Sequence, residues 1–314
     1  MVSNFEYEPE QIEDKIIYDP PNKWSPNDLP GLLKFITSSL ENGTIEESCS
    51  PHNISLVVVP KPHGGDDRYC YNLIRFNKNT RRIDYPITDF DTIVQHLHGC
   101  KIFSVFDIQS AYAAVKVKES KRHLFSFNTP FGCYQAATMP FGSQNSSGVF
   151  LRLMDAMLAG IKFKGVASYV DDLLIWGSSV EEHCKTLKEV LQRFDLSNFR
   201  IAAKKCIIGA KELPFLGFTI SHLGLSQNPA KTAAIDVMDA PTNVTELKSI
   251  LGMAGYYSRF IAGFSVVCYP LYQLLKKDIP FIWTKEHETA LNTIKQILAS
   301  DQVMAYPDYT KSFI

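Results

Sequence analysis

The chain has 314 residues, of which 45% are hydrophobic and 21% charged, an ordinary composition for a globular protein with one large or two smaller domains. No apolar run reaches the about 18 residues of a membrane span, and the acidic start of the chain is unlike a signal peptide, so we expect no membrane partner. The seven scattered cysteines contain no CxxC pair, which argues against a zinc site or a disulfide framework and fits a reducing, cytosolic setting.

The residue pattern predicts mixed strands and helices up to about residue 222, and only helices after about residue 228. In chain order, the expected elements are a helix over 29–45, a hairpin over 52–74, a short helix over 87–100, a strand over 101–108, a hairpin over 123–142, a helix over 146–161, a strand–turn–strand over 166–177, a helix over 180–197, a strand over 213–221, and helices over 244–264 and 284–300.

Two adjacent acids, Asp171 and Asp172, interrupt the apolar run 165–179, and Asp107 ends another apolar strand in the same way. Ionised carboxylates in an apolar strand are costly unless water, a basic partner or a metal ion compensates them. No Lys or Arg lies within 165–179, which excludes a local ion pair and leaves either an exposed hairpin tip or a metal site. If the two strands are neighbours, three carboxylates meet, and such a group suits Mg²⁺ and the two-ion clamp of phosphoryl or nucleotidyl transfer.

Charge is unevenly distributed along the chain, although its net value is only −1. Residues 1–50 carry ten acids and three bases, and in the remainder 29 Lys and Arg outnumber 23 Asp and Glu. Basic clusters stand at 75–82, 116–122 and 200–205. Each is either a solvated face or a set of contacts to nucleic-acid phosphates.

An ordered set of motifs carries a resemblance to a known family. The motifs are "SVFDIQSAY", "FNTPFGCYQAATMPFGSQNSSGVFLRLMD", "YVDDLLIW", "EEHCKTLKEVLQRF", "KKC", "LPFLGFTIS", "LKSILGMAGYYSRFI" and "PLYQLLKKD". The chain resembles the reverse transcriptase of gypsy-type (Metaviridae-like) LTR retrotransposon Pol polyproteins, and more distantly that of retroviruses.

The resemblance implies an α+β fold of the right-hand polymerase type, with fingers, an antiparallel palm sheet and a helical thumb. The expected divisions are a lead-in with the first fingers helix over 1–50, fingers and palm over 51–222, the thumb over 223–303, and over 304–314 the start of a connection to an RNase H domain. The chain is therefore expected to be a piece of a longer polyprotein.

The resemblance also implies roles for residues of the catalytic centre. Asp107, Asp171 and Asp172 match the metal-binding acids, and the backbone carbonyl of Ile108 matches a further metal ligand. Lys205 in "KKC" matches a lysine that could protonate the leaving pyrophosphate, with a plain surface lysine as the other interpretation.

Further residues match the family's substrate contacts. Lys61 and Arg68 match cations that grip the triphosphate, and Tyr112 matches the aromatic residue that excludes a 2′-hydroxyl. The dNTP-binding loop is matched by Pro140 and Phe141, followed by Gly142. The primer grip is matched by Leu216 and Gly217.

The activity implied is that of an RNA-directed DNA polymerase, a nucleotidyltransferase that extends a primer 3′-hydroxyl with dNTPs on an RNA or DNA template. Two Mg²⁺ ions are the implied cofactors, and Mn²⁺ can substitute. The implied partners are the template–primer duplex, dNTPs, and either a second copy or the neighbouring RNase H and integrase domains of Pol. The implied location is the cytoplasm, in a virus-like particle.

One departure from the family keeps an alternative open. Residues 72–77 read "NLIRFN" where Asp-Tyr-Arg-x-Leu-Asn is usual. The missing Asp and Arg are either one lost ion pair or a sign of weakened fingers packing. The second case favours a catalytically weak or domesticated nucleic-acid-binding remnant that keeps the polymerase fold.

Overall fold

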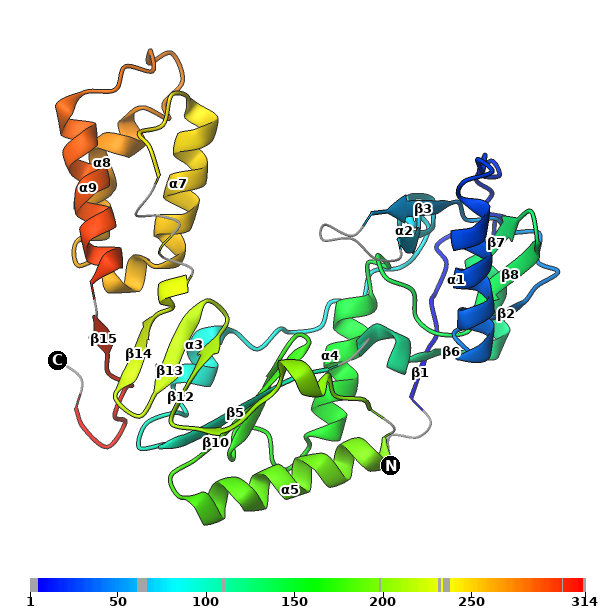
Figure 1. Ribbon diagram of the computed structural model, residues 1–314, viewed down its shortest axis with the longest axis horizontal. Coiled ribbons are helices and arrows are strands. Elements are labelled where there is room, and N and C mark those ends of the chain that lie inside the picture. Colours follow the sequence, from blue (N-terminus) through cyan, green and yellow to red (C-terminus); the bar gives the residue numbers. More distant parts are fainter. Residues whose placement is uncertain are drawn as a thin grey trace. The chain divides into compact units, whose positions relative to one another are not determined.

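The computed structural model describes residues 5–60, 67–108, 111–197, 199–230, 233, 238–300 and 302–312 (Figure 1). The chain forms two compact units. Unit 1 comprises Met1–Ile93, Phe106–Ile175 and Cys184–Cys206, and unit 2 comprises Val94–Val105, Trp176–His183 and Ile207–Ile314. The sequence-based boundaries at 50, 222 and 303 stay a prediction.

Among the described residues, unit 1 holds most of the strands of the chain and the helices α1 and α4. Its elements are β1 (Glu6–Tyr7), α1 (Leu29–Glu41), β2 (Ile45–Glu47), β3 (Leu56–Val59), β4 (Arg68–Tyr71), α2 (Ile74–Lys78), β6 (Lys116–Val117), β7 (Ser126–Thr129), β8 (Gly132–Ala136), α4 (Ser146–Met157) and β9 (Val166–Tyr169), with short 3-10 helices η1 (Ala111–Ala114), η2 (Glu119–Phe125) and η3 (Ala203–Lys205). Four further elements contribute residues to both units: α3 (Phe90–Val94), β5 (Ile102–Asp107), β10 (Asp172–Gly177) and α5 (Val180–Leu196).

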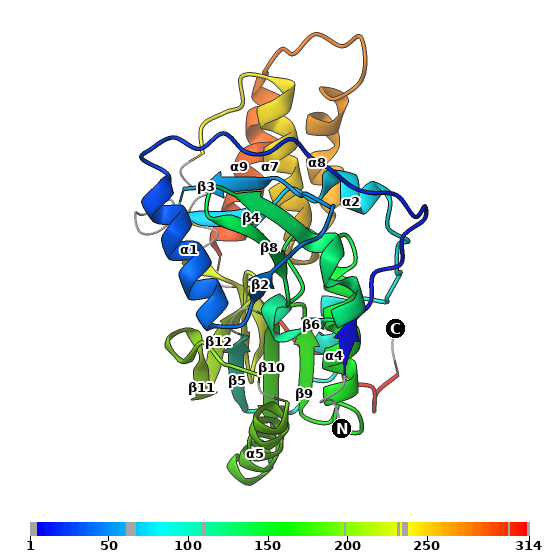
Figure 2. The same cartoon turned by 90° about the vertical axis from the view of Figure 1, so that its right-hand side faces the viewer.

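Three antiparallel pairings of unit 1 confirm the expected hairpins. Strand β3 pairs with β4, β7 with β8, and β9 with β10. Strand β2 joins the outer edge of β8, and α1 lies beside this three-stranded sheet (Figure 2). Strands β5 and β10 are neighbours in a four-stranded sheet, whose order is β11-β5-β10-β9 with β11 formed by Ile207–Ala210. The ends of β5 and β10 therefore determine where their terminal side chains lie.

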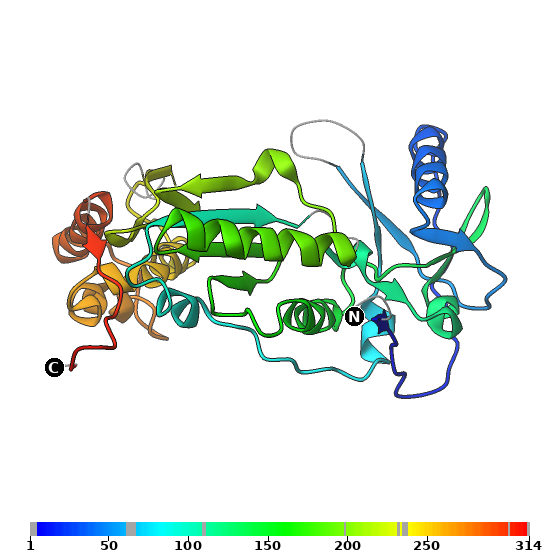
Figure 3. The same cartoon turned by 90° about the horizontal axis from the view of Figure 1, so that it is seen from below.

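The core of unit 1 lies between the strands and the apolar faces of α4 and α5. Phe150 and Met154 of α4 and Phe194 of α5 are buried together with Leu173 and Ile175 of β10. Helix α5 runs along this sheet, as Figure 3 shows from below. Aromatic and branched side chains that fill such a layer exclude water and give the strands a rigid support.

An N-terminal segment, residues 5–22, crosses unit 1 and ties its parts together. Strand β1 pairs in parallel with β6, and the buried Tyr7 hydroxyl lies 2.9 Å from Ser143 Oγ. The Asn79 side chain donates to the Glu13 carbonyl at 2.8 Å, and the Asp19 backbone donates to the Asn53 carbonyl at 2.7 Å. These long-range bonds make the segment part of the fold.

In its described residues, unit 2 combines a small antiparallel sheet with the helices α7, α8 and α9. Its elements are β11 (Ile207–Ala210), β12 (Glu212–Phe215), β13 (Phe218–Ser221), β14 (Gly224–Gln227), α7 (Val244–Tyr256), η4 (Ser258–Phe260), α8 (Phe264–Gln273), α9 (Lys285–Ala299) and β15 (Val303–Met304). Helix α7 begins at Asn243, whose side chain accepts a hydrogen bond from the Glu246 backbone at 3.0 Å. Helix α8 packs against α9, and buried leucines of all three helices form the interior.

Three sequence-based expectations for this region were wrong. The single strand expected over 213–221 is two strands, β12 and β13, joined by a turn at Leu216 and Gly217. Strands also do not stop at 228, because β15 pairs with β14 through Leu225 and Met304. These two corrections reflect backbone geometry and tertiary pairing that residue patterns do not reveal. The single helix expected over 244–264 was too long: α7 ends at Tyr256, η4 follows it, and α8 is a separate helix that begins at Phe264. The helix expected over 284–300 is present as α9.

The structure also bears on the expectation about membranes. No helix in the described ranges is both long and apolar enough to cross a bilayer.

We predict that Gly224→Ala destabilises the β14–β15 pairing. Gly224 has a φ of +141°, and an added Cβ would meet the Met304 carbonyl oxygen and lie 2.9 Å from the Met304 carbonyl carbon. The free energy of unfolding should fall by about 1–3 kcal/mol. Gly252→Ala is the matched control, because an added Cβ on this exposed α7 residue has open space. It should raise stability by about 0.5–1 kcal/mol. Thermal unfolding of both variants measures the difference, and equal midpoints would contradict the prediction.

Candidate active site

A tight turn between β9 and β10 sets the positions of two acids. Asp172 pairs with Tyr169, so only Val170 and Asp171 form the loop. Val170 has a φ of +52°, which is rare for a β-branched residue and costs on the order of 1–3 kcal/mol. The strained residue, Val170, therefore lies immediately before the acid pair. Such backbone strain persists only where surrounding contacts stabilise it.

Main-chain hydrogen bonds place Asp107, at the end of β5, beside this turn. The Ile108 backbone N–H donates to the Asp171 carbonyl at 3.2 Å. The Ala202 backbone N–H donates to the Asp107 carbonyl at 3.0 Å. The structure thus brings Asp107, Asp171 and Asp172 together, and the Ile108 N–H contacts the turn that carries Asp171. The role of the Ile108 carbonyl as a metal ligand stays a prediction.

The three carboxylates influence one another electrostatically. Burial, and next the charge of Asp107, raise the pKa of Asp171 above its usual value. Burial, followed by the charges of Asp107 and Asp171, also raises the pKa of Asp172, while Lys205 opposes this rise. Asp171 and Asp172 are therefore harder to ionise than a solvated aspartate. A bound cation would have the opposite effect, because it would stabilise the ionised carboxylates.

Lys205 contacts the first of these acids. Its Nζ lies 2.9 Å from Asp107 Oδ2, and Lys205 ends the short helix η3. The Lys205 side chain is 67% exposed and that of Asp107 30%, so the pair is open to solvent on the lysine side. The structure thus places Lys205 at the acid cluster and not on a remote surface.

A divalent cation fits the chemistry of this cluster. Asp171 Oδ1 is buried and has no hydrogen-bond partner among the described residues. A buried carboxylate oxygen without a donor is costly, and hard oxygen ligands suit Mg²⁺. Within the described ranges, however, no three His, Cys, Asp or Glu side chains are already arranged as a metal-binding group. The carboxylates would need to reorient around an ion.

Tyr112, in η1, lies in an aromatic cluster next to the predicted nucleotide loop. Its ring meets the edges of Phe141 and Phe150 at centroid distances of 5.1 Å and 5.8 Å. Its hydroxyl lies 3.2 Å from Ser147 Oγ in the first turn of α4. Sequence reasoning did not single out Ser147, because a serine near a helix start usually signals only a helix cap.

The loop 140–142 is held from two sides. Pro140 is buried and its carbonyl accepts a bond from Ser146 Oγ at 3.2 Å, whereas Phe141 is 56% exposed. The Asn77 side chain donates to the Gly142 carbonyl at 2.8 Å and accepts from the Gln144 backbone at 2.9 Å. Asn77 therefore clamps the loop, a role that the residue pattern alone did not reveal.

The remaining predicted site residues lie in two places. Arg68 is the first residue of β4, opposite Val59, and is exposed. Lys61 lies outside the described residues. Leu216 and Gly217 form the turn between β12 and β13 in unit 2.

The altered run 72–77 has its own ion pair. Arg75 Nε lies 3.2 Å from Asp19 Oδ1, and Arg75 Nη1 donates to the Tyr18 carbonyl at 2.8 Å. The Asp19 side chain is only 8% exposed and also accepts bonds from the Ser55 backbone and hydroxyl. Arg75 thus ties helix α2 to the N-terminal segment. It lies one position after Ile74, which stands where the family usually has an arginine.

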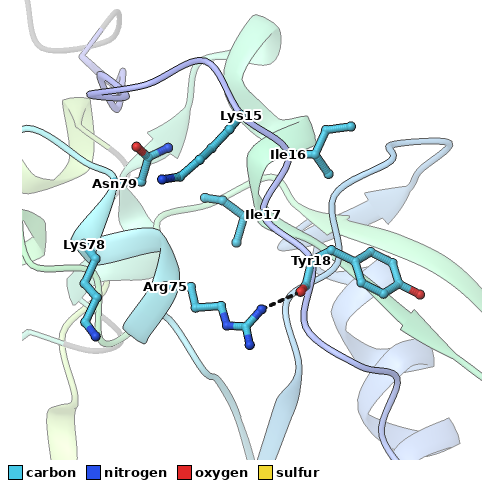
Figure 4. A pocket seen from close by; sticks show the side chains of 7 residues that line it. All are labelled: Lys15, Ile16, Ile17, Tyr18, Arg75, Lys78 and Asn79. Atoms are coloured by element: carbon cyan, nitrogen blue, oxygen red, sulfur yellow. Dashed lines mark hydrogen bonds between the residues drawn. The ribbon is translucent and has the colours of Figure 1, made fainter.

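A separate hollow of about 330 Å³ adjoins this pair. Figure 4 shows it between the N-terminal segment and α2, with Lys15 and Arg75 on its rim. The acids of the candidate active site do not line it. An open surface depression of this kind does not mark the catalytic centre.

The comparisons identify the class of protein. The family "Reverse transcriptase (RNA-dependent DNA polymerase)" matches residues 57–220, and the chain belongs to this family. This range includes every described acid of the cluster and the turn at 216–217.

Individual relatives show which members of this family the chain resembles. The chain is 30% identical over 284 residues to the retrovirus-related Pol polyprotein from transposon 297 of Drosophila melanogaster, covering 89% of the chain and 27% of that protein. It is 29% identical over 289 residues to the transposon Tf2-3 polyprotein of Schizosaccharomyces pombe, covering 92% of the chain and 22% of that protein. The chain thus spans about a quarter of the length of these relatives, and its resemblance to LTR retrotransposon Pol polyproteins is confirmed.

Solved structures share the fold. A foamy viral protease–reverse transcriptase in complex with double-stranded DNA has a TM-score of 0.82 at 24% identity, covering 98% of this chain and 53% of that one. Another, in complex with an RNA/DNA hybrid, has a TM-score of 0.76 at 24% identity, covering 95% and 41%. The predicted α+β fold of the right-hand polymerase type is therefore confirmed.

We predict that Asp172→Asn stabilises the protein in metal-free buffer. The raised pKa means that the ionised Asp172 carboxylate opposes folding. This cost in folding free energy is fully present at a pH above the raised pKa. It disappears as the pH falls towards the usual pKa of an aspartate. The unfolding midpoint with EDTA at neutral pH should rise by a few degrees, and the gain should shrink under acidic conditions.

Asp195→Asn, which neutralises an exposed acid of α5 outside the cluster, is the control for this prediction. Exposed surface substitutions change stability by about 0.5 kcal/mol or less, so the midpoint should change little. A lower midpoint for Asp172→Asn than for the unmodified chain would contradict the electrostatic interpretation of the cluster.

Proposed function

We propose that the chain is an RNA-directed DNA polymerase that extends a primer 3′-hydroxyl with dNTPs on an RNA or DNA template. The observation that carries the proposal is the meeting of three carboxylates at the ends of two apolar strands, where Asp171 Oδ1 has no protein donor among the described residues. Stability alone gives no reason to gather these charges, whereas metal-assisted nucleotidyl transfer requires them.

Asp107, Asp171 and Asp172 would hold the metal ions, with the Ile108 carbonyl as a further ligand. Two Mg²⁺ ions, or Mn²⁺ in their place, would supply the activation of the primer hydroxyl and the stabilisation of the leaving phosphates. The short chain separation between Asp171 and Asp172, together with the bond from Ile108 to Asp171, keeps these ligands in a fixed relation.

The nucleotide would lie against the aromatic cluster of unit 1. Tyr112 would exclude a 2′-hydroxyl by steric contact, supported by the ring contacts with Phe141 and Phe150. Pro140 and Phe141 would contact the nucleotide from the loop that Asn77 clamps. Arg68 and, on the resemblance alone, Lys61 would neutralise the triphosphate.

Lys205 would act as the proton source for the leaving pyrophosphate. Its contact with Asp107 and its solvent-exposed position support this role, since an exposed lysine can exchange protons with water. In the ion-free protein the same lysine partly compensates the charge of Asp107.

Leu216 and Gly217 would hold the primer end as the primer grip, and the helices of 223–303 would form the thumb that contacts the duplex. The related foamy viral structures contain double-stranded DNA or an RNA/DNA hybrid, which supports a template–primer partner. The relatives are polyproteins much longer than this chain, which supports neighbouring domains in a longer protein. RNase H and integrase as those domains, a homodimer as the other assembly, and a cytoplasmic virus-like particle as the location are proposed on the resemblance alone.

The rival proposal is a remnant that binds nucleic acid without catalysis. Its main support was the altered run 72–77. The ion pair between Arg75 and Asp19 nevertheless anchors helix α2. The remnant proposal therefore cannot be based on weak packing of the fingers around this run. Loss or retention of extension separates the two proposals.

We predict that Asp171→Asn reduces primer extension on a poly-rA template with Mg²⁺ by roughly 1000-fold or more. This is the size expected when several kcal/mol of charge stabilisation in the transition state is lost. The affinity for template–primer, measured by fluorescence anisotropy, should change little because phosphate contacts lie elsewhere. Asp195→Asn, which alters an exposed acid of α5, is the control and should extend normally. Near-normal extension by Asp171→Asn would overturn the assignment.

We predict that Tyr112→Val admits rNTPs because the discrimination is a clash with the aromatic ring. The ratio of kcat/KM for dNTP over rNTP should fall by roughly tenfold or more. Tyr112→Phe is the matched control: it keeps the ring and loses only the hydroxyl contact with Ser147, so the ratio should stay high. Single-nucleotide incorporation measures both variants. An unchanged ratio in Tyr112→Val would exclude Tyr112 as the steric barrier.

A further inference from the structure

The turn between β12 and β13 has a backbone that its own sequence does not favour. Phe215 pairs with Phe218, so Leu216 and Gly217 alone form the loop. Their φ angles are +48° and +77°, the signature of a type I′ turn. Asn-Gly or Gly-Gly is usual there, and a leucine in the left-handed region costs on the order of 1–2 kcal/mol. Contacts from elsewhere must hold this turn.

Two consecutive tyrosines at the end of α7 supply such contacts. The Tyr257 hydroxyl donates to the Gly217 carbonyl at 3.0 Å, and the Tyr256 hydroxyl donates to the Leu216 carbonyl. The Gly217 carbonyl also accepts from the Asn228 backbone at 3.3 Å. Both carbonyls of the strained turn are therefore fixed in direction by groups outside it.

Packing around Phe218 holds the tyrosines in place. The Tyr256 ring stacks on Phe218 at 5.0 Å, and the Tyr257 ring meets it edge-on at 5.5 Å. The Arg259 guanidinium lies 5.2 Å from the same ring. Phe218 is 1% exposed and Tyr257 4%, whereas Tyr256 is 50% exposed, so Phe218 and Tyr257 belong to the core of unit 2 and join α7 to the sheet.

The absence of a side chain at Gly217 allows this approach. An added Cβ would lie 3.3 Å from Tyr256 Cε1 and 3.4 Å from the Tyr257 hydroxyl oxygen. Tyr257 is only 4% exposed, and burial raises the pKa of its hydroxyl, which keeps it a protonated donor at neutral pH. A residue so buried acts on the turn and not directly on a bound nucleic acid.

We propose that Tyr257, assisted by Tyr256, is a positioning residue that holds the Leu216–Gly217 turn in the geometry required to place the primer 3′ end. This inference rests on the proposed function, in which the turn is the primer grip. The two hydroxyls set the carbonyl directions of the turn, and the cluster at Phe218 couples these directions to helix α7.

The test compares Tyr257→Phe with Tyr306→Phe. Tyr306 is 7% exposed, and its hydroxyl donates to the Gly224 carbonyl at 3.0 Å in the same sheet, so both changes delete one buried tyrosine-to-glycine bond. Tyr257→Phe should lower kcat for primer extension by roughly fivefold, the effect of one lost neutral hydrogen bond, with unchanged template–primer affinity and dNTP KM. Tyr306→Phe should leave kcat unchanged.

A second change tests the strain directly. Leu216→Asn creates an Asn-Gly turn, which adopts the left-handed geometry readily. In the Tyr257→Phe background it should restore the protection of the turn against hydrogen exchange, a backbone readout that does not depend on the Leu216 side chain in the primer grip. Normal kcat in Tyr257→Phe, an equal loss in Tyr306→Phe, or no recovery of protection in the double variant would each overturn the proposal.

Hydrogen–deuterium exchange separates this proposal from the polymerase assignment. In Tyr257→Phe, amides in peptides covering 212–228 should exchange faster than in the unmodified chain. In Tyr306→Phe, the exchange of peptides within 212–221 should not change. Adding Leu216→Asn to Tyr257→Phe should restore the protection. If the unmodified chain extends no primer, the polymerase assignment fails, while this exchange pattern still supports the tyrosine-held turn. Unchanged exchange in Tyr257→Phe would refute the positioning role whatever the activity.

Discussion

The repulsion among three partly buried carboxylates is the constraint on which the candidate active site depends. Asp107 ends β5, Asp172 begins β10 and Asp171 lies in the turn before it, and main-chain bonds such as that from Ile108 to Asp171 prevent them from separating. The raised pKa values of the acid pair and the contact of Lys205 with Asp107 are direct consequences of this crowding. A rigid, apolar support is needed to keep charges so close, and the core between α4, α5 and the sheet provides it.

Two tight turns, one in each unit, place residues in backbone regions that they rarely adopt. Val170 precedes the acid pair, and Leu216 begins the predicted primer grip, each with a positive φ. The ways in which the two are held differ. The first is constrained by the ladder of β9 and β10, and the second by tyrosine hydroxyls from α7. Proteins commonly concentrate such strain at functional positions and stabilise it through the surrounding structure.

Sequence patterns predicted most elements because their periodicity is local. The three hairpins of unit 1 and the amphipathic helices α5 and α9 follow directly from alternation or helical spacing of apolar residues. The acids were found because charge inside an apolar run is conspicuous. The split of 213–221 was missed because Leu216 gives no turn signal. Strand β15 was missed because two residues, Val303 and Met304, become a strand only through pairing with β14.

The contacts that sequence reasoning could not supply join residues far apart in the chain. Ser147 meets Tyr112, and Tyr257 meets Gly217 forty residues away, without any periodic pattern to reveal either contact. Such side-chain contacts depend on how the elements pack.

The pairing of Arg75 with Asp19 limits how this sequence can diverge. Asp19 is nearly buried, so a change at position 75 that removed the cation would leave an uncompensated acid beneath the N-terminal segment. Positions 19 and 75 can therefore change only as a correlated pair. A substitution at one of them is expected to be tolerated only when the other position changes with it, although the two lie 56 residues apart in the chain.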